Sequence, residues 1–184
     1  MASAITLPVL ITPKKVIMHT TTTAPAHLES PLLPAWLKAL LQTESSWLPV
    51  VARVALGAVM LPHGLQKLFG WFGGYGFTNT MNWFTGAMHV PWILGLAAIL
   101  AESFGAVALL VGFGTRLAAA AVGAVFVTAI AMVHAPNGFF MNWTGAQKGE
   151  GIEYFILGLA LVAIVLVRGA GAASVDRWLS RKTD

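Results

Sequence analysis

The stretch that decides the fold is PWILGLAAILAESFGAVALLVGFGTRLAAAAVGAVFVTAIAMVHA, residues 91–135. It contains two long apolar runs, 91–111 and 116–135, which are joined by the short turn 112–115. A helix needs roughly 20 mainly apolar residues to cross a bilayer, with a range of about 17 to 25. Both runs are long enough, so the stretch predicts two consecutive membrane-spanning helices.

The rest of the chain extends this pattern to four helices. Of the 184 residues, 57% are hydrophobic and only 10% are charged, whereas a soluble domain carries about 25% charged residues. Two further apolar runs, 47–69 and 152–168, flank the central pair. The sequence therefore predicts an all-α integral membrane protein, a four-helix bundle whose outer surface contacts the lipid bilayer.

The distribution of basic residues predicts the orientation. Four spans place both termini on one side of the membrane, and that side carries most of the basic residues: Lys14, Lys15, Lys38, Arg116, Arg168, Arg177, Arg181 and Lys182. Cytoplasmic loops carry an excess of Lys and Arg. We therefore expect both termini in the cytoplasm, with the protein in a bacterial cytoplasmic (inner) membrane.

Three regions follow from composition. Residues 1–46 contain several prolines and a run of threonines, and they predict a mobile N-terminal tail with an interfacial helix near its end. Residues 47–168 form the four-span membrane domain, and residues 169–184 form a cytoplasmic C-terminal tail.

Several classes of chemistry are disfavoured by composition. The absence of cysteine excludes thiol redox chemistry and thiolate metal sites. No Lys/Arg block suggests nucleic-acid binding, and no flavin or dinucleotide fingerprint is present. No metal site is predicted.

Glu102 is the sharpest anomaly in the apolar runs. It follows Trp92, near the expected start of its span, by ten residues, or about 15 Å at about 1.5 Å per residue. Since the hydrocarbon core is about 30 Å thick, the carboxylate is expected near the midplane. An ionised group there costs on the order of 3 kcal/mol, so we expect Glu102 to face the other helices and to have a cationic partner.

Other ionisable side chains are expected in the outer half of the same bundle. His63 and Lys67 are four residues apart and share a helical face, and Glu102 is the expected counter-charge. His134 ends the third span. Each also has an ordinary explanation, because lysine can snorkel to the surface and a histidine can be structural. The hypothesis is that His63, Lys67, Glu102 and His134 form a catalytic pocket.

A second set of residues is predicted to bind a cofactor. Trp71, Phe72 and Trp83 lie in the aromatic loop after the first span and can wall a pocket. Glu153 opens the fourth span, where a carboxylate also complements the helix dipole.

Two motifs carry a family resemblance: RVALGAVMLPHGLQKLFGWFGGYG, residues 53–76, and LAESFGAVALLVGFGTRLAAAAV, residues 100–122. Together with a histidine at the end of the next run, they resemble the DoxX/DoxD-like small membrane proteins over about residues 50–168. The resemblance implies a four-helix membrane bundle. Some members are subunits of thiosulfate:quinone oxidoreductases, so it also implies a quinone-linked oxidoreductase.

The leading hypothesis is a membrane oxidoreductase or oxidoreductase subunit with quinone as cofactor. Quinone reduction needs two protons, which a histidine and a carboxylate can carry. Because the sequence shows no electron carrier, a soluble redox partner subunit or the substrate itself must supply electrons. A transporter or proton pathway centred on Glu102, a non-catalytic scaffold and haem ligation by two histidines stay open, as does a homo-oligomer.

Overall fold

The computed structural model describes residues 34–182, and all regular structure in this part of the chain is helical. Most of the predicted N-terminal tail, residues 1–33, lies outside the described residues. Its last part contains the predicted short helix, α1 (Ala35–Leu41).

Within residues 34–182, three helices are long and apolar enough to cross a membrane. The first is α2 (Leu48–Phe69). The second, Trp92–Val111, joins α4 (Trp92–Leu100), η3 (Ala101–Gly105) and α5 (Ala106–Val111). The third, Thr115–Asn137, joins α6 (Thr115–Ala129), η4 (Ile130–His134) and η5 (Ala135–Asn137). The prediction of an all-α chain with these three apolar helices is confirmed.

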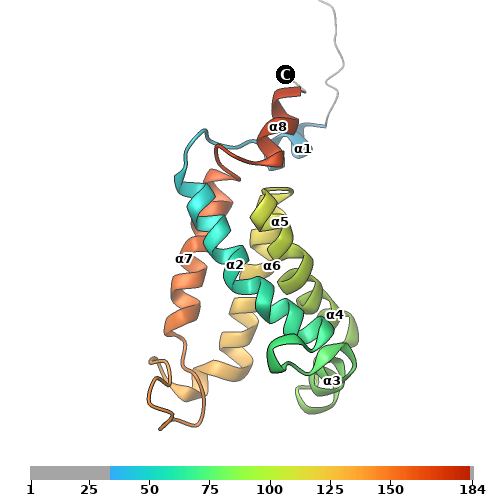
Figure 1. Ribbon diagram of the computed structural model, residues 1–184, viewed down its shortest axis with the longest axis vertical. Helices are drawn as coiled ribbons and strands as arrows, with labels where there is room; N and C mark the ends of the chain where they lie inside the picture. The colour runs from blue at the N-terminus through green and yellow to red at the C-terminus, as the bar shows by residue number, and fades with distance from the viewer. Residues whose placement is uncertain (1–33, 183–184) are drawn as a thin grey trace, which may run out of the picture. The chain divides into compact units, whose positions relative to one another are not determined.

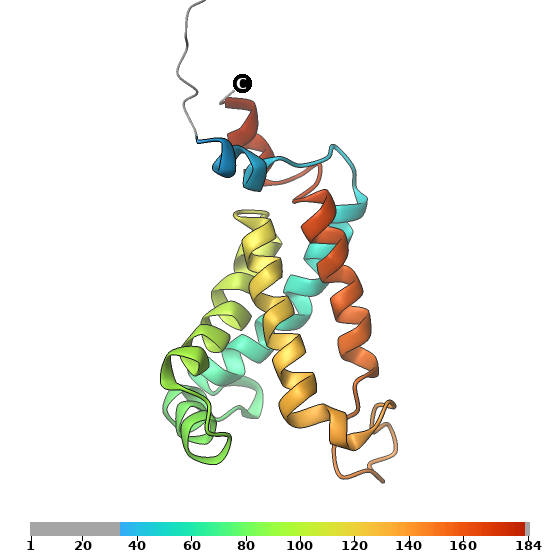
Figure 2. The ribbon, with the colours of Figure 1, turned by 180° about the vertical axis from the view of Figure 1, so that it is seen from behind.

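The fourth apolar run forms α7 (Glu153–Arg168), a helix of 16 residues. Figure 1 shows α2 between α7 and α5, and the view from behind in Figure 2 shows α6 between α4 and α7. These helices bury a shared core of small and branched side chains, among them Leu56, Leu109, Val122 and Val165. Many large apolar side chains remain exposed on the outer faces of the three long helices, where they can contact lipid.

Short helices close the two ends. At one end η1 (Trp71–Gly73), α3 (Gly76–Asn82) and η2 (Trp83–Ala87) connect α2 to α4. At the other end α1 lies beside α8 (Val175–Lys182), as both views show. The C-terminal segment was read from sequence as a tail, yet residues 169–182 pack onto the helices and include this helix.

Arg53 joins three of these elements at the end that carries α8. The residue is only 2% exposed, and its guanidinium donates to the backbone carbonyls of Leu109 (2.7 Å) and Leu110 (2.6 Å) near the C-terminus of α5. It also donates to the carbonyls of Ala170 (2.8 Å) and Ala173 before α8. The last carbonyls of a helix have no partner within the helix, so Arg53 caps α5 and attaches the C-terminal segment to it.

Asp176 completes this junction from α8. Its side chain is buried, and its carboxylate accepts hydrogen bonds from the backbone N–H groups of Gly114 (2.7 Å) and Thr115 (2.9 Å) at the start of α6. A carboxylate at a helix N-terminus satisfies unpaired donors and complements the dipole. The turn Gly112–Thr115, part of the second family motif, therefore has a structural role.

Candidate functional site

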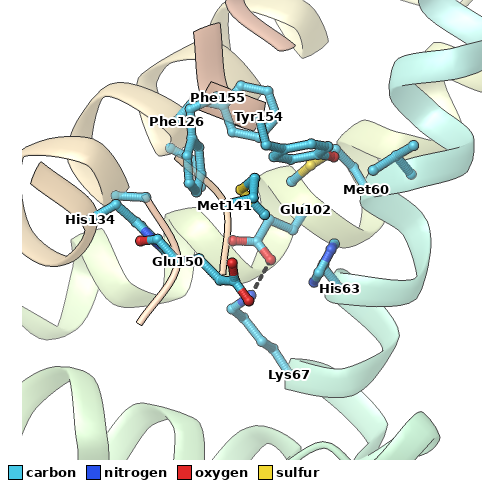
Figure 3. Close-up of a pocket in the computed structure, with 13 residues that line it drawn as sticks. Met60, His63, Lys67, Glu102, Phe126, His134, Met141, Glu150, Tyr154 and Phe155 are labelled. Atoms are coloured by element: carbon cyan, nitrogen blue, oxygen red, sulfur yellow. Dashed lines mark hydrogen bonds and ion pairs between the residues drawn. The ribbon is translucent and has the colours of Figure 1, made fainter. Parts of the chain in front are cut away.

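A cavity of about 380 Å³ lies between α2, α6, η4 and α7. We call it the polar cavity, and Figure 3 shows its lining: Val59, Met60, His63, Lys67, Glu102, Val125, Phe126, Ala129, His134, Met141, Glu150, Tyr154 and Phe155. All four residues predicted to be catalytic are in this set. The structure thus brings together side chains from three separate apolar runs, and their catalytic role stays a prediction.

Lys67 and Glu102 form an ion pair between Lys67 Nζ and Glu102 Oε2. The Glu102 side chain is 6% exposed, whereas that of Lys67 is 27% exposed. A buried carboxylate is costly unless a cation and hydrogen bonds compensate for its lost hydration. Lys67 provides that compensation from the last turn of α2, so the ion pair belongs to the wall of the cavity.

Glu102 and His134 both lie in π-helical turns. Glu102 is in η3, which interrupts the α-helix between α4 and α5, and His134 is in η4, which follows α6 and leads into the 3-10 helix η5. Short π-helical segments inside α-helices occur frequently at functional sites. Both π-helical turns therefore lie at the cavity that the ionisable side chains line.

His134 is held in place from the loop before α7. Its Nδ1 lies 2.9 Å from the backbone carbonyl of Glu150, and its ring packs on Phe155 with centroids 4.4 Å apart. A carbonyl only accepts hydrogen bonds, so Nδ1 carries the proton in this contact. In the neutral ring Nε2 is then an acceptor, and it can receive a hydrogen bond from a ligand.

His63 has a different environment. It lies on the α2 wall one helical turn before Lys67, and its side chain is exposed. Figure 3 shows its ring on the same side of α2 as Lys67. His63 therefore presents its ring at the surface of the cavity.

The residues predicted to bind a cofactor are dispersed. Trp83 lines a second cavity, described below, while Trp71, Phe72 and Glu153 line neither cavity. Trp71 and Phe72 are exposed on η1. Glu153 accepts a hydrogen bond from the backbone N–H of Met141 (3.1 Å), which attaches the loop before α7 to that helix.

The second cavity is larger and more apolar. It measures about 570 Å³ and lies between η2, α4, η3 and α6. We call it the alanine cavity, because small side chains from facing helices line it: Gly95, Ala97, Ala98, Ala101, Ala121 and Ala124. Lys67, Glu102 and His134 line both cavities. The ion pair therefore lies at the boundary between a polar and an apolar compartment.

Gly64 sets the distance between Lys67 and Glu102. A Cβ atom at Gly64 would lie 2.5 Å from the backbone oxygen of Glu102 and 2.6 Å from the Cα of Ser103. The backbones of α2 and η3 are thus in close contact, as small residues allow in membrane helices.

We expect Gly64→Ala to destabilise the folded protein by about 1–3 kcal/mol, because the methyl group forces η3 away from α2. Thermal unfolding in detergent measures this. Gly86→Ala is the matched control, since a Cβ at Gly86 meets nothing within 4 Å. Equal unfolding temperatures for the two variants would contradict the close contact.

A comparison with known protein families covers part of this site. Residues 48–135 match the family model described as DoxX. Over this range the chain is similar to the DoxX family. A search of curated proteins gave no match, and a search of solved structures gave none. The DoxX match and the three apolar helices together indicate an integral membrane protein.

The DoxX match includes much of the site. Its range covers His63, Lys67, Glu102 and His134. The resemblance inferred from sequence extended to about residue 168, whereas α7 and the loop before it lie outside the matched range. The polar cavity is therefore built by residues inside the matched range together with a segment beyond it.

That segment supplies residues which sequence reasoning missed. The lining of the polar cavity includes four residues from it: Met141, Glu150, Tyr154 and Phe155. Glu150 was not among the predicted site residues, and the backbone carbonyl that holds His134 has no sequence signal. An aromatic pair directly after Glu153 at the start of an apolar helix was the available sign for Tyr154 and Phe155.

Proposed function

We propose that this protein is a quinone-linked membrane oxidoreductase or the membrane subunit of one. The observation that carries the proposal is the polar cavity, where two histidines and a Lys–Glu ion pair face apolar and aromatic walls. Its volume of about 380 Å³ lies within the range of about 300–1,000 Å³ usual for small-molecule sites. An apolar ring with two carbonyl oxygens fits this combination of walls and donors.

The proposed topology has four spans. The helix α7, with 16 residues, reaches about 24 Å, and it crosses the membrane together with the three longer helices. The basic residues Lys38, Arg116, Arg168 and Arg177 lie on or beside the elements at the α1 and α8 end. This bias supports the proposed orientation, in which both termini are cytoplasmic, the membrane is a bacterial inner membrane and the polar cavity lies in the outer half.

Each residue has a proposed role in this site. His63 donates a hydrogen bond to one carbonyl oxygen of the ring, and the cation of Lys67 stabilises negative charge that develops there. Glu102 carries a proton between the cavity and the ring, as a positioned carboxylate can. His134, oriented by the Glu150 carbonyl, serves the second oxygen.

The overall reaction requires an electron source. A quinone bound there would take up two electrons and two protons and leave as the quinol. The electrons come from a soluble redox partner subunit or directly from a reduced substrate. The protons reach the ring through the ionisable side chains of the cavity.

Quinone binding tests the proposal with His63. Purified protein in detergent is titrated with a quinone ring that carries no isoprenoid chain, and binding is followed by quenching of tryptophan fluorescence. We expect saturable binding that His63→Ala weakens about tenfold, because one hydrogen bond to the ring is lost. The side chain of His63 is exposed, so we expect this variant to keep the fold.

The matched control is Asn79→Ala, an exposed polar residue on α3 that lines neither cavity. It should bind the quinone as the wild type does. Absence of saturable binding by the wild type, or equal affinity in all three proteins, argues against the proposed function.

The position of the ion pair also favours a second candidate function, proton transfer through the protein. Lys67 and Glu102 line both cavities, as a relay between two compartments would. Proton flux into liposomes that depends on Glu102 and needs no quinone would favour this candidate over the oxidoreductase.

A further inference from the structure

The alanine cavity is unusual because its two main walls consist of small side chains. Ala97 and Ala98 on α4 and Ala121 and Ala124 on α6 face it. In membrane proteins such residues normally let two helices approach closely. Here the facing helices leave a hollow of about 570 Å³, so the small side chains make room for an occupant.

The chemistry of the lining defines the occupant. The charged and titratable residues in it are Lys67, Glu102, His89 and His134, and the rest of the wall is almost wholly apolar. Trp83 and Phe84 on η2 add a pair of aromatic rings with centroids 5.5 Å apart. An unbranched or methyl-branched hydrocarbon chain fits such a wall, whereas a charged or strongly polar molecule would lose its hydration there.

The boundary with the polar cavity connects this space to the proposed ring site. Lys67, Glu102 and His134 line both cavities, so a ring held by these side chains lies next to the alanine cavity. We propose that the alanine cavity holds the apolar chain of the quinone whose ring binds in the polar cavity. The inference rests on the proposed function and assigns the chain to the groove between α4 and α6.

The alanine cavity does not bind the quinone chain by removing it from water. A quinone chain in a bilayer is already in an apolar solvent, so burial between helices adds little hydrophobic free energy. The cavity instead provides packing contacts and a fixed direction for the chain, which orients the ring against the ion pair. The effect of filling the cavity should therefore be steric and should depend on the presence of the chain.

The test compares two quinones with the same ring, one without a chain and one with a decyl chain. Ala124→Phe and Ala97→Phe each place a large ring in the alanine cavity from opposite walls, and neither residue lines the polar cavity. We expect each variant to weaken binding of the decyl quinone at least about tenfold. Binding of the chainless quinone should change less than about twofold, since its site in the polar cavity is unaltered.

Ala120→Phe is the matched control, because Ala120 is exposed on α6 and lines neither cavity. It should bind both quinones as the wild type does. A photoreactive group at the end of the decyl chain gives a second readout, and we expect labelled residues in α4 and α6. Retained labelling there in Ala124→Phe, or equal loss of both quinones, would overturn the inference.

Three other results would also decide between the inference and the proposed function. If the wild type binds the chainless quinone and the filling variants bind the decyl quinone normally, the inference fails while the proposed function stands. If the wild type binds neither quinone, the proposed function fails and the inference fails with it. A phospholipid that stays bound in quinone-saturated wild type and is lost in Ala124→Phe, detected by native mass spectrometry, would assign the cavity to a membrane lipid and also overturn the inference.

Discussion

Arg53→Met is expected to lower the unfolding temperature of the detergent-solubilised protein by on the order of 10 °C. The variant removes the donors for four backbone carbonyls, those of Leu109, Leu110, Ala170 and Ala173. Each buried carbonyl left without a donor costs about 1–3 kcal/mol, although the costs do not simply add. A loss of roughly 3–5 kcal/mol, as for other disrupted buried charge networks, is therefore expected.

The change should also release the C-terminal segment. We expect faster proteolysis between Gly169 and Val175 in Arg53→Met, because Arg53 attaches this segment to α5. Arg168→Gln is the control, since Arg168 makes an exposed ion pair with Glu44 (2.8 Å), and such pairs contribute about 0–1 kcal/mol. Similar unfolding temperatures for Arg53→Met and Arg168→Gln would show that the carbonyl contacts contribute little.

The second large effect concerns the ion pair, and it separates catalysis from stability. Lys67→Met leaves a carboxylate that is 6% exposed without its cation, whereas Glu102→Gln leaves a lysine that is 27% exposed and can reach water. We expect Lys67→Met to cost about 3–5 kcal/mol and Glu102→Gln only about 1 kcal/mol. The double variant Lys67→Met/Glu102→Gln should recover most of the loss, because no buried charge remains.

Proton uptake by Glu102 can be observed directly. Bound quinone is reduced at an electrode, and infrared difference spectra record the carboxyl groups. We expect the wild type to show a carboxyl signal that is absent in Glu102→Gln and in the double variant. Glu44→Gln and Glu153→Gln should retain it. A signal that persists without Glu102, combined with normal quinone binding by the double variant, would show that the ion pair has only a structural role.

Composition and hydropathy were enough to predict the helices. The bounds of α2 and of the second long helix differ by one residue from the runs read in the sequence, 47–69 and 91–111. Their apolar length leaves few alternatives in a membrane, where backbone groups must be satisfied internally. The C-terminal segment was harder, because its packing depends on contacts of Arg53 and Asp176 with distant backbone atoms. Such contacts have no local sequence pattern.

Part of the site could also be predicted from the sequence. A charge in an apolar run is costly, so Glu102 and Lys67 stood out, and the spacing of His63 from Lys67 placed both on one helical face. Trp71 and Phe72 were selected for their aromatic character, which cannot reveal the direction of a side chain in a loop. The backbone conformation decides it, and Phe72 has a left-handed φ of 52° that the sequence did not predict.

The wide turns at Glu102 and His134 have a consequence for how this chain tolerates change in length. In a π-helical turn the backbone hydrogen bond spans five residues instead of four, so each span contains one residue more than a regular helix of the same rise requires. Removing a single residue from either turn would let the helix close into a regular coil. Side chains on the two sides of such a deletion would keep nearly the same directions, whereas the same deletion in a regular α-helical stretch would rotate one side by about 100° relative to the other. The two turns are therefore the places in these spans where the loss of one residue should disturb the rest of the helix least.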